Sequence, residues 1–436
     1  MALLIIPFCL ITILIVFLTN KDKLFSPIKL FFCMWSMILT LSCIHISALN
    51  VPSNEAYFLI LLMLISFLIG NVFCLYLIQK KTMPQKKKTR VKLFINLFLI
   101  LSSLLIIFYI IDIYMVIKYR IDGYEMWEIR NWTLAPYGSS NPILDRRTVF
   151  ETILRKVILE PFSLLVHPIA AYFLCFEKNK KIKTWMLVVS VLTLVTGSIA
   201  GGGGRLGYVF FVMCYGIAFW TLYRTKGIKK EIFKKYVKII VALSVMAFVA
   251  VLGFTAIRVG KGSFFKQFYK YFALPPTLLS EWLPEIKTIP HTYGLLTTFG
   301  LHSYFFRALS QIGLSSLVPG VFKVAFDSML AAEIVIPVGD GVGNAFVTPV
   351  YYFYIDGGYP FVIIASALFG FLVTYIYNRI IRRMNVRNYV LYMIVLYGVL
   401  VSFMRIQTVI PSYLISILLV FVLTYSGKKR RIHKKK

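Results

Sequence analysis

The feature that most constrains this chain is a series of apolar runs, each about as long as a bilayer is thick. A helix needs roughly twenty apolar residues to cross the hydrocarbon core. Runs of this kind lie at residues 3–18, 28–49, 56–78, 93–117, 157–176, 185–200, 206–223, 239–257, 360–377, 389–404 and 408–425. Because 59% of the residues are hydrophobic and only 15% are charged, a water-soluble fold could not bury them all. The sequence predicts an all-α, polytopic membrane protein with about eleven transmembrane helices, residues 1–436 forming one integral membrane domain.

The net charge of +31 would suit a nucleic-acid-binding protein, but its distribution along the chain indicates membrane topology instead. Basic residues gather in short clusters between apolar runs, the pattern of loops that stay in the cytoplasm. The clearest clusters are residues 80–92, residues 379–387 and the tail KKRRIHKKK. We expect the N-terminus to lie outside, the first run to be a retained helix and the C-terminus to be cytoplasmic, with no nucleic acid as partner.

Two longer loops, residues 118–156 and 258–358, are nearly charge-balanced and are predicted to be external. They are rich in Trp, Tyr, Pro and Gly, as expected of ordered segments that contact a ligand. In the second loop, SFFKQFYKYF places its aromatic side chains on one helical face and its lysines elsewhere. This pattern predicts an amphipathic helix at the membrane interface.

A glycine run followed by arginine is the most specific local feature. Gly203, Gly204 and Arg205 precede the run at 206–223, whose helix N-terminus is predicted to face outward. Unpaired N–H groups, a positive helix end and a guanidinium together suit an anion. The alternative is a tight helix hairpin in which Arg205 only reaches lipid headgroups. Arg258 ends the run at 239–257 in a similar outward position, and two guanidiniums could hold a diphosphate.

The external loops contain further candidates for binding or proton transfer. Arg130, Arg147 and Arg307 are predicted to face outward, although each alone could serve only as a headgroup anchor. His302 stands in an aromatic context where an imidazole could act as a general base or be an ordinary hydrogen-bonded histidine. Asn344 and Asp356, in a loop rich in glycine and tyrosine, suit either sugar binding or a turn-rich loop. No spacing of His, Cys, Asp or Glu predicts a metal site, and no cofactor is expected.

The arrangement resembles the bacterial repeat-unit polymerases of O-antigen and capsule assembly, the Wzy family. The resemblance covers nearly the whole chain in topology. In sequence it rests on Gly204–Arg205, Arg258, the stretch HTYGLLTTFGL at 291–301, residues 344–348 and the pair at 356–357.

This resemblance implies a metal-independent C-type glycosyltransferase in the inner (cytoplasmic) membrane. Its substrates would be undecaprenyl-diphosphate-linked oligosaccharides, as donor and as acceptor, and its partners would include a chain-length regulator and a flippase of the same pathway. Arg205 and Arg258 would stabilise the departing diphosphate, and His302 or a carboxylate of the second loop would take the proton of the acceptor hydroxyl. The remaining candidates, Gly203, Gly204, Arg130, Arg147, Arg307, Asn344 and Asp356, would bind substrate.

Three alternatives remain open. A polysaccharide ligase would share the topology and the donor but use a different acceptor. A flippase or transporter should carry ionisable groups near the middle of the bilayer, whereas Asp112 and Glu160 are predicted to lie toward the outer ends of their spans. A membrane scaffold in a polysaccharide assembly complex predicts that Arg205→Ala and Arg258→Ala leave chain elongation unchanged.

Overall fold

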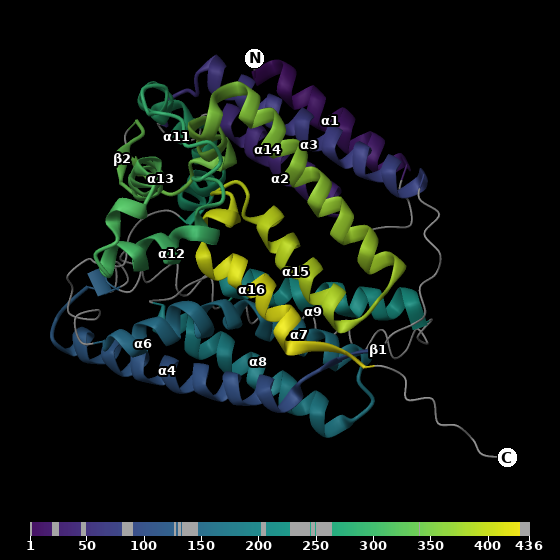
Figure 1. Cartoon of the computed structure of the whole chain (residues 1–436). Coiled ribbons are helices and arrows are strands. Elements are labelled where there is room, and N and C mark those ends of the chain that lie inside the picture. Colours follow the sequence, from purple (N-terminus) through teal and green to yellow (C-terminus); the bar gives the residue numbers. More distant parts are fainter. Residues whose placement is uncertain are drawn as a thin grey trace. The chain divides into compact units, whose positions relative to one another are not determined.

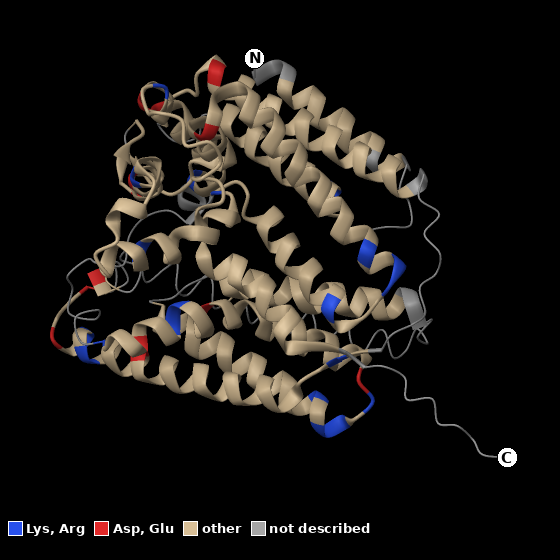
Figure 2. Cartoon of the chain, in the orientation of Figure 1, with Lys and Arg blue, Asp and Glu red and all other residues tan. Residues whose placement is uncertain are grey.

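A computed structural model gives the fold (Figure 1). It describes residues 2–19, 26–44, 49–80, 90–125, 128–129, 132, 147–201, 206–226, 245, 249, 264–339 and 341–427. Within these residues, six helical stretches are long and apolar enough to cross a bilayer: Asn54–Ile78, Ile95–Ile121, Val149–Phe176, Lys180–Ala200, Leu206–Tyr223 and Thr348–Arg382. Figure 2 shows that the charged residues lie mostly near the ends of the long helices. The chain is therefore a multi-pass helical membrane protein.

The structure places a helix over each predicted apolar run except 239–257, which lies almost wholly outside the described residues. Several of these helices are shorter than a full span, among them α2 (Pro27–Cys43), α15 (Val386–Leu400) and α16 (Pro411–Leu423). The count of about eleven spans and the predicted orientation therefore remain predictions.

The chain divides into two compact units. Unit 1 comprises Met1–Lys86, Gly262–Arg383 and Val395–Leu414, and unit 2 comprises Lys87–Lys261, Met384–Ile394 and Ile415–Lys436. The elements of unit 1 are α1 (Ala2–Thr19), α2, α3 (Asn54–Lys80), α11 (Phe264–Ile286), α12 (Phe299–Gln311), the 3-10 turn η2 (Ser315–Leu317), α13 (Gly320–Ala331), β2 (Ile336–Pro337), β3 (Val342–Gly343), α14 (Thr348–Arg382) and the 3-10 turn η3 (Gln407–Val409). The antiparallel pair β2 and β3 forms a minimal hairpin.

Unit 2 contains α4 (Ile95–Ile121), α6 (Val149–Ile153), the π-helix η1 (Leu154–Leu159), α7 (Glu160–Phe176), α8 (Lys180–Ala200) and α9 (Leu206–Lys226). Its two short strands, β1 (Arg90–Leu93) and β4 (Thr424–Gly427), pair antiparallel. Helices α15 and α16 contribute residues to both units.

Glycines bring α3 and α14 into backbone contact within unit 1 (Figure 1). A Cβ atom at Gly70 would lie 1.8 Å from the carbonyl oxygen of Ala367, and one at Gly370 would lie 2.1 Å from that of Phe67. One turn further along, Asn71 donates a hydrogen bond to Thr374. Small residues at a crossing and a buried polar pair are the usual means of joining helices in a bilayer, where hydrophobic burial gives little drive.

Two glycines interrupt α14 where the loop predicted to be external passes into an apolar helix. Gly358 has φ of 64°, in the left-handed region that glycine adopts without strain, and Pro360 follows. The residues before this break, from Thr348 to Asp356, are all buried. The first part of α14 is therefore a core element of unit 1, and the predicted span at 360–377 begins just beyond the break.

Helix α11 covers the segment predicted to be amphipathic. From Tyr269 to Ile286 its side chains are largely buried, and Trp282 packs at right angles to Tyr351 of α14. Its C-terminal end is tied to the loop before α3, where Asn50 donates to Glu281, and to the first turn of α3, where Glu55 pairs with Lys287 at 2.6 Å. This half of the helix belongs to the core, and an interfacial position for the segment before it stays a prediction.

Candidate functional site

A buried carboxylate organises the turn that leads into α12. Asp356 is fully buried at the break in α14, and its Oδ1 atom accepts from the backbone N–H groups of Gly294 and Leu296 at 2.9 and 3.0 Å. The same oxygen accepts from the Thr292 hydroxyl, and Oδ2 accepts from the N–H of Thr297 at 2.7 Å. Charge-assisted bonds of this kind are roughly twice as strong as neutral ones. Asp356 therefore fixes the backbone of residues 292–297.

The tip of this turn presents an exposed aromatic side chain. Tyr293 is 79% exposed and has φ of 52°, a conformation that non-glycine residues seldom adopt. Its N–H donates to the Asp356 carbonyl at 2.9 Å, which helps to hold the conformation. Backbone strain maintained by surrounding hydrogen bonds is often found at ligand-binding positions. No periodicity or motif in the sequence marks Tyr293, because its exposure depends on the turn.

His302, the predicted base, is held by the same turn. Its Nε2 atom lies 2.9 Å from the carbonyl oxygen of Leu295, and since a carbonyl can only accept, Nε2 carries the proton. Nδ1 is then the unprotonated nitrogen, buried and without a hydrogen-bond partner among the described residues. Burial lowers the pKa of His302, while the bond to Leu295 and the charge of Asp356 act in the opposite direction. The imidazole is consequently neutral near pH 7, as a general base must be.

Aromatic rings surround His302 and Arg307. Phe299, Phe306 and Phe322 lie with ring centroids 5.4–5.9 Å from that of His302. The Arg307 guanidinium lies 4.6 Å from the centroid of Phe326, in cation–π contact. Helix α12 thus brings a neutral imidazole and a guanidinium into one aromatic cluster.

Asn344 lies at a polar contact of unit 1 that is separate from the turn held by Asp356. Its amide nitrogen donates to the backbone carbonyl of Glu333 at 3.3 Å, and the Glu333 carboxylate pairs with Arg405. The Asn344 side chain is exposed, so it remains accessible to a ligand. Asp356, in contrast, lies beneath the surface with its oxygens occupied, and a sugar could not reach it without unfolding the turn.

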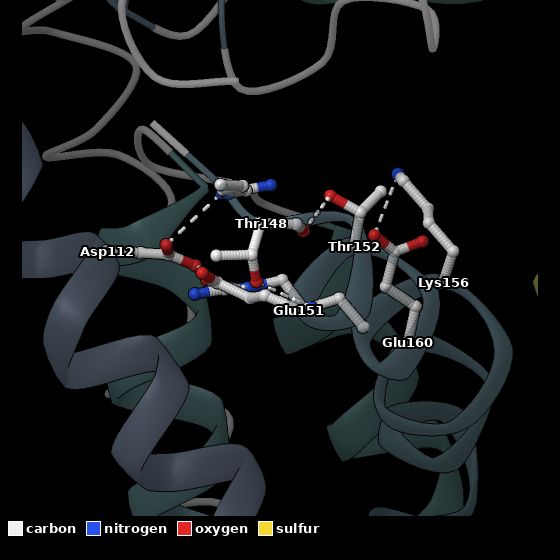
Figure 3. Close-up of polar contacts among 8 residues, drawn as sticks. Asp112, Thr148, Glu151, Thr152, Lys156 and Glu160 are labelled. Carbon is white, nitrogen blue, oxygen red and sulfur yellow. Dashed lines mark hydrogen bonds and ion pairs between the residues drawn. The ribbon is translucent and has the colours of Figure 1, made fainter. Parts of the chain in front are cut away.

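Unit 2 holds a cluster of charges on helices that are candidate spans (Figure 3). Asp112 of α4 accepts from Arg155 at 2.6 Å and from Arg147 at 3.2 Å, and Arg155 also pairs with Glu151 at 2.8 Å. Arg155 lies in the π-helix η1, with its guanidinium 4.5 Å from the centroid of Phe108. Both guanidiniums therefore share one carboxylate, and Arg147 is already engaged within the protein.

A buried histidine of α7 was missed in the sequence, although it stands near the middle of the apolar run at 157–176. His167 Nδ1 lies 2.9 Å from the Ser190 hydroxyl of α8, and both residues are buried. Phe211 of α9 packs edge-on against the imidazole. An intramembrane histidine among apolar residues was the available signal, and it bears on the transporter alternative.

Five predicted site residues cannot be placed. Gly203, Gly204, Arg205, Arg258 and Arg130 lie outside the residues that the structure describes. Among the described residues, no three His, Cys, Asp or Glu side chains gather as a metal site requires. The structure brings together His302, Asp356 and Arg307 around α12 and its preceding turn, and it places Arg147 in a separate cluster of unit 2.

Comparisons with known proteins leave the function to be argued from these contacts. No protein-family model, curated protein or solved structure matches the chain.

Proposed function

We propose that this membrane protein is a glycosyltransferase that joins undecaprenyl-diphosphate-linked oligosaccharide repeat units into O-antigen or capsular polysaccharide, at the outer face of the cytoplasmic membrane. The acceptor hydroxyl oxygen attacks the anomeric carbon of the donor, and the bond from that carbon to the diphosphate oxygen breaks. The hydroxyl proton passes to a base, and undecaprenyl diphosphate leaves with the bonding electron pair.

The proposal rests on the hydrogen bonding and burial of the His302 imidazole. Its tautomer is fixed by Leu295, so Nδ1 offers a lone pair, and burial keeps the ring neutral. A base of this kind can take the proton of an attacking hydroxyl. Because Nδ1 is covered by the surrounding rings, the arriving acceptor must displace one of them, and Phe306, which is only half-buried, is the most accessible.

The sugar and diphosphate contacts are assigned by exposure and charge. Tyr293 offers an exposed aromatic face for a sugar ring, and Asn344 offers an amide. Asp356 acts instead by positioning the turn that carries Tyr293 and holds His302. Arg205 and Arg258 are proposed to bind the diphosphate, because Arg147 is already paired with Asp112.

Elongation by the isolated protein tests the proposal. Purified protein in lipid vesicles, supplied only with lipid-diphosphate repeat units, should produce a ladder of longer glycans. His302→Gln should abolish the ladder and leave thermal unfolding unchanged, whereas Asp327→Asn, an exposed change on α13, should leave both unchanged. A folded wild-type protein that yields only unextended substrate would overturn the proposal. A polysaccharide ligase would instead transfer the glycan only when a different acceptor is added.

A lipid-linked oligosaccharide flippase is the second candidate, favoured by one observation. The Asp112–Arg155 pair and His167 lie on helices that qualify as spans, where ionisable groups often mark a transport path. A flippase would move a fluorescent lipid-linked unit across vesicles without changing its length. Transfer across the membrane that is lost in His167→Gln with thermal unfolding unchanged, but kept in His302→Gln, would favour this candidate over the polymerase.

A further inference from the structure

Helix α12 exposes an apolar stripe. Leu301, Phe305 and Ile312 are 70%, 62% and 69% exposed, and the exposed Ala308 lies between them on the same face. These residues follow one another at intervals of three or four, which places them on one side of a helix. The stripe continues beyond the helix through the exposed Leu317 of η2 and contains no charged residue.

The opposite side of the same helix holds His302, Ser303 and Arg307, while Ser310 and Gln311 in its last turn are exposed. Ser303 is buried, and His302 and Arg307 are partly buried among the rings of Phe299 and Phe322. A helix on a water-facing loop shows the reverse arrangement, with apolar residues inward and polar residues outward. The polarity of α12 is therefore that of a helix whose outer side faces hydrocarbon.

Helix α13, which follows in the same loop, provides the contrast. Its exposed residues include Lys323 and Asp327, one helical turn apart, while Phe322, Ala325 and Ser328 are buried. This is the ordinary arrangement for a helix in water. The apolar stripe of α12 is thus a property of that helix and not of the whole external loop.

The start of α12 lies against the entry to an apolar helix. A Cβ atom at Gly300 would lie 2.7 Å from the carbonyl oxygens of both Thr408 and Ile410, the residues just before α16. Thr408 also donates its hydroxyl to the carbonyl of Thr297 at 2.6 Å. The first turn of α12 is therefore fixed beside the point where the chain enters an apolar segment.

We propose that α12 lies in the margin of the bilayer, with Leu301, Phe305, Ala308 and Ile312 among the lipid acyl chains. With 13 residues, the helix is about 20 Å long, at about 1.5 Å per residue, and it cannot cross a hydrocarbon core of about 30 Å. It dips into one leaflet and holds His302 and Arg307 on its protein-facing side at that depth. The inference depends on exposure and polarity alone and stands whether or not the protein transfers glycans.

Site-directed spin labelling tests the proposal in the full chain. The six cysteines, all free, are replaced, and single cysteines are introduced by Phe305→Cys, Ile312→Cys, Lys323→Cys and Asp327→Cys. The protein is placed in vesicles of phosphatidylethanolamine and phosphatidylglycerol. Labels at 305 and 312 should show a ratio of oxygen to nickel-chelate accessibility about fivefold or more above that at 323 and 327, because a polar chelate is excluded from hydrocarbon.

Two other outcomes would overturn the proposal. Nickel-chelate accessibility at 305 and 312 equal to that at 323 would place the stripe in water. Low accessibility to both reagents would mean that protein covers the stripe, whether another part of the chain or a second copy. Thermal unfolding matched to the cysteine-free protein shows that each labelled variant is folded, and Leu301→Cys gives an independent position on the same stripe.

Discussion

Replacing Asp356 by Asn should loosen the turn before α12. The carboxylate accepts four hydrogen bonds, from the Thr292 hydroxyl and from the N–H groups of Gly294, Leu296 and Thr297. The side-chain amide of Asn has one oxygen, which is best placed where Oδ1 now accepts three of these bonds. Its NH2 group then faces the N–H of Thr297, so that two donors oppose each other in a buried site.

The expected cost follows from the bonds that change. The lost bond leaves a buried N–H unsatisfied, at about 1–3 kcal/mol, and the three remaining bonds lose their charge assistance. Together these effects amount to about 2–4 kcal/mol. If the turn opens locally, the amides of Gly294, Leu296 and Thr297 should exchange with solvent roughly 30- to 900-fold faster, at about 1.36 kcal/mol for each factor of ten.

Amide hydrogen exchange measured by mass spectrometry on purified protein gives the readout. Asp327→Asn is the matched control, because it makes the same chemical change at an exposed position. Thr292→Val, which removes only one donor, should produce a smaller acceleration and serves if the Asp356 variant does not fold. Equal exchange at residues 294–297 in the Asp356 and Asp327 variants would refute the argument that this carboxylate holds the turn.

Three further predictions concern packing, charge and pH. Gly70→Ala should destabilise the protein by about 3 kcal/mol, because the new methyl group meets the backbone of α14. Gly216→Ala is the control and should not destabilise it, since a Cβ there meets nothing within 4 Å. Thermal unfolding of the two variants measures the difference. Asp112→Asn should cost about 2–3 kcal/mol, because it removes the carboxylate that pairs with Arg147 and leaves Arg155 with Glu151 alone. Adding Arg155→Met should recover part of the loss in a double-mutant cycle. Burial lowers the pKa of His302 below the ordinary value of 6.5, so the imidazole stays neutral to a lower pH than a free histidine does. The rate of elongation should therefore decline only below pH 6.5. A pH–rate profile with its acid midpoint above 6.5 would contradict the assignment of His302 as the base.

Hydropathy predicted the positions of the helices because lipid exposure requires long apolar runs whatever their partners are. The start of α8, for instance, was predicted at residue 185 and the structure begins it at Lys180. The extra turn is basic, and lysines at a helix end are compatible with the interface although they do not count as apolar. Apolar runs therefore locate the helices but not their ends, since α2 and α16 are shorter than the runs at 28–49 and 408–425 while α8 is longer than its run.

The pairing of side chains could not be predicted in the same way. Asp112 and Arg155 are far apart in the sequence, and their contact depends on how α4 packs against η1. Asp356 resembled a sugar ligand because it stands among glycines and tyrosines, and only its burial and its four hydrogen bonds show that it organises the turn. Local composition therefore indicates which side chains are candidates for a site, but the packing of distant segments determines the role of each one.

The distribution of acidic residues separates the arginines into two kinds. Arg405 pairs with Glu333, and Arg147 and Arg155 share Asp112, so a diphosphate at any of them would have to displace a carboxylate. No Asp or Glu occurs in residues 178–230, around Arg205.

Residues 232–280, which include Arg258, likewise contain no acidic residue. A guanidinium that no buried carboxylate holds binds a phosphate at a lower cost than one that must first release such a partner, and we propose that Arg205 and Arg258 are of the first kind. Arg205→Ala and Arg258→Ala should therefore abolish elongation while leaving thermal unfolding unchanged. Arg405→Ala should lower stability by about 1–3 kcal/mol, because it leaves the Glu333 carboxylate without its partner. The division of the arginines into structural and ligand-binding groups is wrong if the Arg205 and Arg258 variants unfold at a lower temperature than the wild type. It is also wrong if the Arg405 variant loses only activity.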